Sequence, residues 1–267
     1  MTLAEAVARL VTAAKIYQRD RALKPIERRL VADMRKAFRE HRRVFLQEFE
    51  RYGPRVFGEA APLPIEGALE IAYQSTRDMF TGPIEEAAAA SIAAAARHRV
   101  AEFGIDYAFD LKNPRAIAAI KAQAVASVEE IDATTRDDLT RILTQGMEEG
   151  YNYQQAARAI AAKYDEYAVP VTRPRHIRNR AELIAVTEAA EAYETGNRLV
   201  IDEMTAVGLE MEKQWSTVGD ERVSAGCREN SQAGWIPVDQ LFPSGHQHPP
   251  RFPGCRCATL YRRRPTT

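Results

Sequence analysis

The sequence has no net charge, no long hydrophobic run and few cysteines. Its 37 Lys and Arg residues balance 37 Asp and Glu residues over 267 positions, which excludes a protein that works mainly by whole-surface attraction to DNA or to a membrane. No apolar run approaches the ~20 residues of a membrane-spanning helix, and the first residues lack the pattern of a signal peptide. We therefore expect folding in a cytoplasm and no membrane partner. Three cysteines, an odd number, argue against a fold held by disulfides.

Charge is distributed unevenly along the chain. Residues 1–58 carry a balance of +7, residues 59–170 of −8 and residues 171–267 of +1. A basic front and an acidic middle indicate a partner that is met in a fixed orientation. The cations that we select as candidate contacts for DNA or for an acidic protein surface form two groups, Arg39, Arg42 and Arg43 in the first segment and Arg262, Arg263 and Arg264 at the end. The alternative is that they are solvated side chains of ordinary surface elements.

Residues 1–58 are predicted to form a helical N-terminal arm. Apolar residues at three- and four-residue steps predict a helix from Leu3 to about Tyr17, and a second, longer helix is expected between Pro25 and the stop signal Gly53-Pro54. The apolar stripe of the second helix, Phe38, Phe45, Phe49 and Tyr52, is interpreted as ordinary core. The alternative is a docking surface, if the linker that follows leaves the arm free. The segment from Gly58 to Pro64 has two prolines and little periodicity, so we expect a linker.

The middle of the chain contains further helix signals. Gly82-Pro83 predicts the start of an alanine-rich helix that ends at Gly104, so residues 59–104 are interpreted as a linker followed by that helix. The helix starts expected beyond it lie at Asn113-Pro114, Thr135, Asn152 and the capping box Asn179–Glu182. The helix from Asn152 is expected to end at Tyr164 and to precede a loop over 165–178, and the helix from Asn179 is expected to end at Gly208.

From Leu209 the pattern changes to the alternation that is typical of strands. Strands are expected around Trp215, over Trp235–Val238 and over Thr259–Tyr261. The sequence therefore predicts a mostly α protein with a small C-terminal β unit (α+β), the unit being a compact meander that contains cysteine and histidine.

The C-terminal segment gathers sulfur and imidazole side chains. The candidate metal ligands are Cys227, His246, His248, Cys255 and Cys257. Residues two apart on an extended segment share one face, so Cys255 and Cys257 could bind one ion, with Cys227 and one histidine completing a tetrahedron. A structural zinc ion is the predicted cofactor, because so small an apolar core needs further support. The alternative is that the cysteines are buried free thiols and the histidines are loop residues.

The same segment resembles a known family. The residues that carry the resemblance are Trp215-Ser216-Thr217, Asp220-Glu221-Arg222-Val223, Cys227, Gly234, Phe242, Pro249-Pro250 and Pro253-Gly254-Cys255-Arg256-Cys257, preceded by Ala185-Val186-Thr187-Glu188, Ala192 and Gly196 on the helix upstream. Together they are similar to the phage head morphogenesis family of Mu F-like minor head proteins, over roughly residues 105–262. We therefore expect residues 105–267 to form such a domain, with Thr187, Glu188, Trp215, Asp220 and Arg222 as structural motif residues.

The resemblance implies a function in assembly. It implies a minor capsid protein of a tailed phage or prophage that binds the portal and procapsid or scaffold proteins and is located inside the capsid. Contact with packaged DNA is suggested by the two arginine groups and not by the resemblance. The sequence departs from the family pattern at Cys227 and Phe252, where members often have His, and at Glu194, where members have Asn. If the family site binds a metal, the change at Phe252 makes His246 or His248 the substitute ligand.

Known enzyme motifs are not recognisable in the sequence. It contains no GxGxxG motif after a strand, no Walker sequence and no GxSxG motif. Thr187 and Glu188 are interpreted as packing or capping residues, and Asp220 with Arg222 as a structural pair or turn. We therefore expect no catalysis. The alternative is a metal-dependent nuclease or a toxin-associated enzyme domain, in which a histidine and a water would share the metal.

Overall fold

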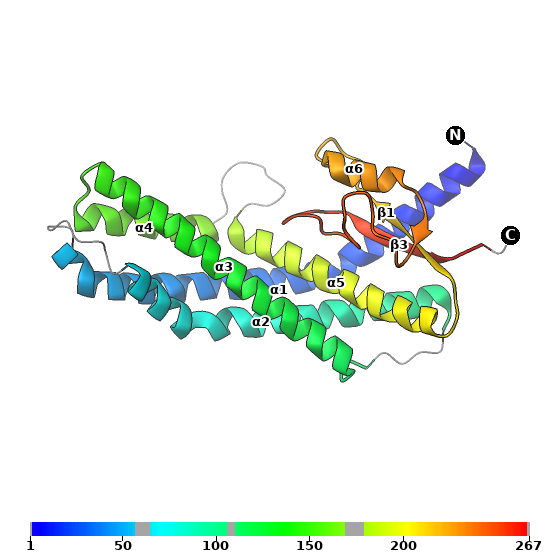
Figure 1. Ribbon diagram of the computed structural model, residues 1–267, viewed down its shortest axis with the longest axis horizontal. Coiled ribbons are helices and arrows are strands. Elements are labelled where there is room, and N and C mark those ends of the chain that lie inside the picture. The colour runs from blue at the N-terminus through cyan, green and yellow to red at the C-terminus, as the bar shows by residue number, and fades with distance from the viewer. Residues whose placement is uncertain (1, 57–64, 106–109, 169–178, 266–267) are drawn as a thin grey trace. The chain divides into compact units, whose positions relative to one another are not determined.

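A computed structural model describes residues 2–56, 65–105, 110–168 and 179–265. These residues form six helices and three strands (Figure 1). In chain order they are α1 (Leu3–Val56), α2 (Ile65–Phe103), α3 (Pro114–Glu148), α4 (Tyr153–Ala168), α5 (Arg180–Ala206), β1 (Met211–Ser216), α6 (Ala225–Gln232), β2 (Ile236–Pro237) and β3 (Ala258–Arg263). The prediction of a mostly α protein with a small C-terminal β unit is confirmed. Among the described helices, none has the length and apolar character to cross a membrane.

Asparagine caps begin three of the helices at the expected places. The side-chain oxygens of Asn113, Asn152 and Asn179 each accept a backbone N–H from the first turn of α3, α4 and α5. These bonds satisfy amide groups that have no partner inside a helix. Gly208, with φ +88°, follows the end of α5, as expected of a residue that ends a helix.

Four predicted helix boundaries are wrong. α1 continues through Pro25 and through Gly53-Pro54, and α2 continues through Pro83. Pro25 is tolerated because Leu23 and Leu30, on the turns that flank it, are both buried, and this packing offsets one lost helical hydrogen bond. α3 has no break at Thr135, whose Oγ1 donates to Ile131 O of the preceding turn instead of capping a new helix.

Smaller differences concern the loops. α4 extends to Ala168, four residues beyond the predicted end at Tyr164. The predicted linker Gly58–Pro64 lies outside the described residues, and so do Pro170 and Pro174. The division of the chain into segments 1–58, 59–104 and 105–267 stays a prediction.

The chain forms two compact units, each assembled from separate stretches of sequence. One comprises residues 1–28, 87–120 and 186–267, and the other residues 29–86 and 121–185. We call them the C-terminal unit and the bundle unit.

The bundle unit has an aromatic core. Phe38 of α1 packs edge-on against Phe80 of α2, with ring centroids 5.2 Å apart, and contacts Tyr167 of α4 at 5.1 Å. Phe45 and Phe49 are also buried, so the interpretation of the apolar stripe as core is confirmed for its three phenylalanines. The side chain of Tyr52 lies outside the described part of the chain.

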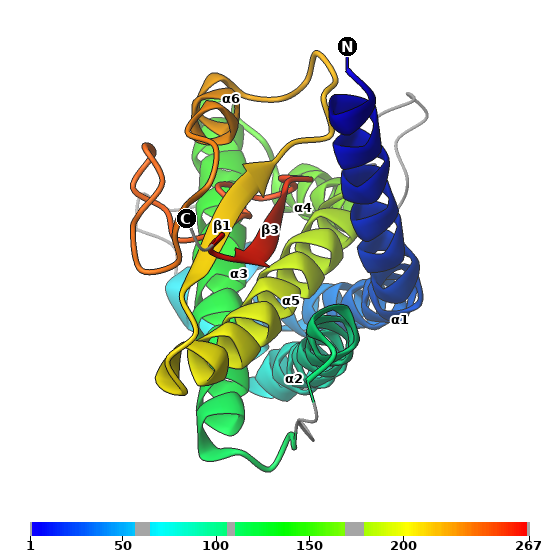
Figure 2. The ribbon, with the colours of Figure 1, turned by 90° about the vertical axis from the view of Figure 1, so that its right-hand side faces the viewer.

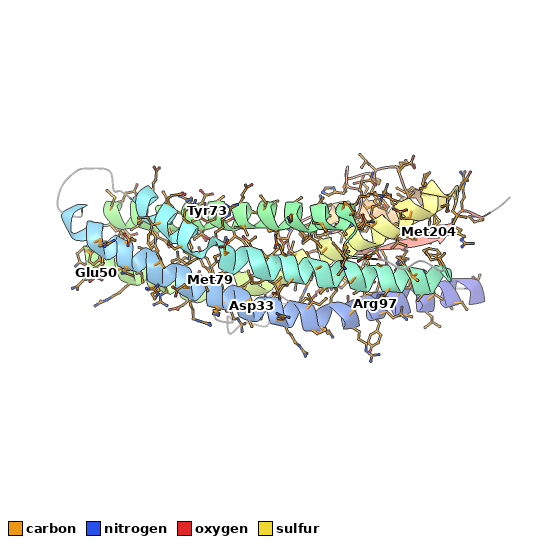
Figure 3. All side chains as sticks on the ribbon, turned by 90° about the horizontal axis from the view of Figure 1, so that it is seen from below. Asp33, Glu50, Tyr73, Met79, Arg97 and Met204 are labelled. Atoms are coloured by element: carbon orange, nitrogen blue, oxygen red, sulfur yellow. The ribbon has the colours of Figure 1, made fainter. Side chains whose placement is uncertain are left out.

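The C-terminal unit is built on α5, against which the small sheet packs (Figure 2). Val200, Ile201 and Met204 of α5 form a buried cluster with residues of the sheet (Figure 3 labels Met204). On another side α5 approaches α2 at Gly196, where a Cβ atom would lie 2.6 Å from Ile92 O. The glycine is therefore required by the close contact of the two helix backbones.

The sheet has the order β2-β1-β3, with both neighbours antiparallel to β1. The expected meander, in which the second strand would be central, is wrong. β1 and β3 each bury four of their six side chains and pair along their whole length, whereas β2 has only two residues and can offer little pairing. In the observed register Trp215 of β1 lies opposite Thr259 of β3.

Candidate metal centre

The structure brings the three cysteines together. Their sulfur atoms all lie within 4.8 Å of one another, and the sulfurs of Cys227 and Cys255 are 3.9 Å apart. All three side chains are buried. The prediction that Cys227 joins Cys255 and Cys257 across the intervening chain is confirmed.

Cys227 is positioned by the start of a helix. Ser224 is the N-cap of α6, and its hydroxyl accepts the backbone N–H of Cys227 at 3.3 Å. This bond places Cys227 in the first helical turn, on the side that faces the core. The local sequence Ser224-Ala225-Gly226-Cys227 therefore determines where this sulfur points.

Cys255 and Cys257 lie on a tight loop just before β3. Gly254 has φ +78°, a conformation that favours glycine, and the N–H of Cys255 donates to Phe252 O at 3.0 Å. We call residues 254–257 the cysteine loop. The turn aims both sulfurs at Cys227 from one side.

A small apolar cluster encloses the sulfurs. It contains the three cysteines with Trp215, Val223, Ile236 and Phe242. Trp215 is fully buried and packs edge-on against Phe242 at a centroid distance of 5.2 Å. The motif tryptophan thus forms one wall of the cysteine site.

The site favours a negative charge on one sulfur. Hydrogen bonding from Cys257, backbone N–H groups of Arg251 and Cys257, and the Cys227 thiol together lower the pKa of Cys255 to about 5, against the effect of burial. The Cys255 thiolate and burial in turn raise the pKa of Cys257. Cys255 is therefore the sulfur of the pair that carries a negative charge more readily.

The indole of Trp215 points a donor at the same sulfurs. Its Nε1 is buried and has no oxygen or nitrogen partner among the described residues, and its proximity lowers the pKa of Cys257. A buried N–H that faces a thiol becomes well satisfied when that sulfur carries a negative charge, as a metal-bound sulfur does.

The two candidate histidines are not part of the group. Among the described residues, the atoms close enough to hold one ion are the three sulfurs alone. His246 uses Nδ1 to contact Ser244 O at 2.9 Å, and His248 uses Nδ1 to contact Pro249 O at 2.9 Å. Each bond places the proton on Nδ1 and leaves Nε2 as the nitrogen that could bind a metal. Histidine ligation stays a prediction.

α5 holds both ends of the cysteine loop. Thr187 Oγ1 accepts the N–H of Gly254 at 2.9 Å, and Glu194 Oε1 accepts the N–H of Thr259 at 3.1 Å. Glu194 is itself buried, and its other oxygen accepts a bond from Asn197. Thr187 therefore binds the backbone of the loop, and Glu194, where the sequence departs from the family pattern, supplies a carboxylate that binds the backbone of β3.

α1 supplies a third support that the sequence did not indicate. Arg19 Nη1 donates to Cys257 O at 2.6 Å, and its Nη2 donates to Arg256 O at 3.2 Å. The Arg19 side chain is almost fully buried. One more arginine in a basic helix carries no distinguishing sequence signal, so only the fold reveals its role.

Two other motif residues lie near the cysteine loop: Glu188 on α5, and Asp220, which pairs with a residue of the loop. Burial raises the pKa of Glu191, and the neighbouring Glu194 and Glu188 raise it further while His248 lowers it, so Glu188 and Glu191 share one acidic face of α5. Asp220 accepts the N–H of Arg222 at 3.1 Å, which confirms the expected turn. Its ion-pair partner, however, is Arg256 of the cysteine loop, at 2.6 Å.

Most of the candidate contact arginines already have acidic partners. Arg42 pairs with Asp165 and Arg43 with Glu40, each at 2.6 Å. Arg262 pairs with Glu212 at 2.7 Å and stacks on Trp235, and Arg264 pairs with Glu210 at 3.2 Å. Arg39 and Arg263 are exposed. These pairs reduce the positive charge that either group presents to a partner.

The arrangement fits a soft divalent cation. Ligand sulfurs at about 2.3 Å from a tetrahedral zinc ion lie about 3.8 Å apart, close to the 3.9 Å between Cys227 and Cys255. Because the sulfurs are buried in an apolar cluster and tied down from two helices, the geometry suits a structural role.

Residues 137–260 match the family described as phage Mu protein F like protein. The matched segment runs from within α3 into β3 and includes Thr187, Trp215 and the three cysteines. The resemblance predicted from the sequence is thereby confirmed over these residues. No curated protein and no solved structure matches the chain.

Proposed function

We propose that this chain, whose residues 137–260 carry the phage Mu protein F like segment, is a minor head protein of a tailed phage or prophage that acts without catalysis. It binds the portal protein and procapsid or scaffold proteins during head assembly in the host cytoplasm, and it remains inside the capsid. The observation that carries the proposal is the family match over the segment that contains the cysteine site.

The architecture of the matched segment supports an assembly role. The side chains that the family resemblance selects are used to fasten the cysteine loop: Thr187 binds Gly254, Asp220 binds Arg256 and Trp215 covers the sulfurs. Residues that are committed to such internal contacts stabilise a rigid surface for binding.

A structural zinc ion at Cys227, Cys255 and Cys257 is part of the proposal. The fit rests on the sulfur separations, on the low pKa of Cys255 and on the buried indole N–H that faces Cys257. Bound zinc would convert the thiols to thiolates and link α6 to the cysteine loop. His246 or His248 would complete the ligand set through Nε2, which requires the segment that carries the two histidines to shift toward the sulfurs.

Contact with packaged DNA is a further part of the proposal, through Arg39 and Arg263, which are exposed. The neighbouring arginines contribute less because they are paired with carboxylates. If DNA is bound, affinity should fall steeply between about 50 and 200 mM salt. Retention of the protein at high salt would point to the portal alone.

The direct test is the composition of assembled heads. Purified heads from the phage that encodes the chain should contain it, and full-length tagged protein should capture the portal protein encoded beside it. A chain that is absent from heads and captures neither portal nor procapsid proteins would overturn the proposal. The full chain is needed, because a version that begins after α1 would lack Arg19 and with it a support of the cysteine loop.

A further inference from the structure

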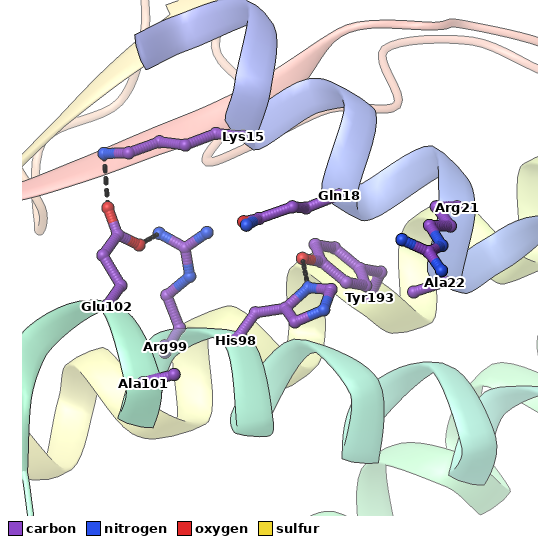
Figure 4. Close-up of a pocket in the computed structure, with 9 residues that line it drawn as sticks. All are labelled: Lys15, Gln18, Arg21, Ala22, His98, Arg99, Ala101, Glu102 and Tyr193. Atoms are coloured by element: carbon purple, nitrogen blue, oxygen red, sulfur yellow. Dashed lines mark hydrogen bonds and ion pairs between the residues drawn. The ribbon is translucent and has the colours of Figure 1, made fainter.

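A second candidate site lies in the C-terminal unit, between α1, α2 and α5 (Figure 4). It is a cavity of about 600 Å³, within the size range of small-molecule sites. Figure 4 shows Lys15 and Arg21 reaching in from α1, His98, Arg99 and Glu102 from α2, and Tyr193 from α5. None of the cysteines lines it, so it is separate from the candidate metal centre.

The lining carries more positive than negative charge. Lys15, Arg21 and Arg99 are cations, whereas Glu102 is the one carboxylate of the lining. Glu102 serves two of them, since one of its oxygens contacts Lys15 and the other contacts Arg99. Two positive charges therefore remain without a matching anion in the cavity wall.

Arg99 is the group that most needs a ligand. It is only 5% exposed, and its guanidinium lies over the ring of Tyr261 at 5.7 Å. Its Nη1 contacts Glu102, and Figure 4 shows the other terminal nitrogen of the guanidinium turned toward Gln18 and the middle of the cavity. An oxyanion is the acceptor that best fits a buried guanidinium.

The other polar groups of the cavity are neutral at physiological pH. His98 Nδ1 and the hydroxyl of Tyr193 are 2.7 Å apart. Burial, with Arg99 and Arg97, lowers the pKa of His98, and burial raises the pKa of Tyr193 to about 12. The pair thus offers hydrogen bonds without adding charge, and the cavity keeps its positive excess across neutral pH.

We propose that this cavity binds a phosphate group on Arg99, Arg21 and Lys15. A phosphate monoester is a dianion, which matches the excess of two positive charges, and its several oxygens can meet donors from opposite walls at once. The group could be presented by a free phosphate ester or by the 5′-phosphorylated end of a nucleic acid. The proposal rests on the cavity alone and is independent of the assembly role.

Isothermal titration calorimetry on the full chain tests it. The probes are inorganic phosphate, a nucleoside monophosphate and the parent nucleoside, at low ionic strength and neutral pH. The monophosphate should bind and the nucleoside should not. Arg21→Gln and Arg99→Lys should weaken binding about 10-fold or more, the range for a lost hydrogen bond to a charged group. Lys24→Gln, an exposed change on the same helix outside the cavity, should leave binding unchanged.

A further pair of probes distinguishes the two sources of the phosphate, a free ester and the 5′ end of a nucleic acid. A 5′-phosphorylated oligonucleotide that binds more tightly than its unphosphorylated form, and more tightly than the monophosphate, assigns the site to a nucleic-acid end. Preference for the monophosphate assigns it to a free ester. If Arg99→Lys does not fold, Arg21→Gln decides the question because Arg21 is exposed. Absence of binding up to about 10 mM phosphate or monophosphate, or unaltered binding by Arg21→Gln, would overturn the proposal.

Discussion

Arg19 and Cys257 are 238 positions apart in the sequence, and the guanidinium of the first donates to the carbonyl oxygen of the second at 2.6 Å. The bond joins the first helix to the loop that holds two of the three clustered sulfurs. With Thr187 and Glu194 of α5 it fixes the backbone on both sides of Cys255 and Cys257. The beginning of the chain is therefore part of the C-terminal unit.

Removing this guanidinium should weaken the C-terminal unit. Arg19→Gln leaves the carbonyl oxygens of Cys257 and Arg256 without their buried donor, which should lower the free energy of unfolding by about 1–3 kcal/mol. Chemical denaturation measures the change. Lys24→Gln, on an exposed position of the same helix, is the control and should change stability by less than about 0.5 kcal/mol. Equal stabilities of the two variants would show that the bond contributes nothing.

Thr187→Val tests the second support. The substitution keeps the shape of the side chain but removes the oxygen that accepts the N–H of Gly254, so we expect a loss of about 1–2 kcal/mol of folding free energy. Thr205→Val is matched to it, because the Thr205 hydroxyl donates to Ile201 O of its own helix. Thermal unfolding should show a clear decrease for the first and little change for the second. A larger effect at Thr205 would contradict the assigned role.

Gly196→Ala should be strongly destabilising. The added Cβ would lie 2.6 Å from Ile92 O and 2.7 Å from Ile92 Cα, both backbone atoms that cannot move aside cheaply. Forced separation of α5 and α2 should cost about 1–3 kcal/mol or more. Gly67→Ala, where a Cβ meets nothing within 4 Å on a helix, should instead stabilise by about 0.5–1 kcal/mol. The same sign of change at both positions would count against the close contact.

The bundle unit should lose stability in mild acid. Burial, with Arg136 and Arg180, lowers the pKa of His41 from 6.5 to about 4, and its Nδ1 is 2.6 Å from the hydroxyl of Tyr164. Because the folded state prefers neutral His41, its contribution is complete above pH 6.5 and is lost as the pH falls toward 4, by about 3 kcal/mol at most.

His41→Gln isolates this effect from the titration of carboxyl groups. Denaturation is measured at several pH values between 4 and 7 for both proteins, and the difference between wild type and variant should shrink as the pH falls. An NMR titration of His41 should give a midpoint far below 6.5. A constant difference in stability, or a midpoint near the ordinary value, would refute the assignment.

Local sequence signals predicted the helix caps and the strands well. Asn113, Asn152 and Asn179 act within one turn of their own helices, so neighbouring residues suffice to identify them. The cysteines could be grouped because sulfur and imidazole side chains are rare and chemically distinctive. Proline and glycine misled the boundary predictions, because burial of apolar side chains next to Pro25 and in the long α2 outweighs the local cost of a lost hydrogen bond.

Contacts between distant segments could not be predicted from local pattern. Arg19 reaches Cys257, and Glu194 reaches Thr259, only because α1 and α5 are placed against the cysteine loop by the rest of the core. Likewise the order of the strands depends on which of them pair in the folded unit, which the alternation of a six-residue segment does not reveal. The ion pairs that the candidate contact arginines form with acidic residues could not be predicted from local pattern either.

The metal content of the purified full chain tests the central claim most directly. Under reducing conditions at neutral pH we predict one zinc ion per chain, its loss in Cys255→Ser, and its retention in the control Thr205→Val. Chelation should lower the unfolding temperature of the wild type and leave Cys255→Ser unaffected. A well-folded wild-type chain with no bound metal, whose stability does not respond to zinc or to chelator, would contradict the claim that the three sulfurs fasten this unit through an ion.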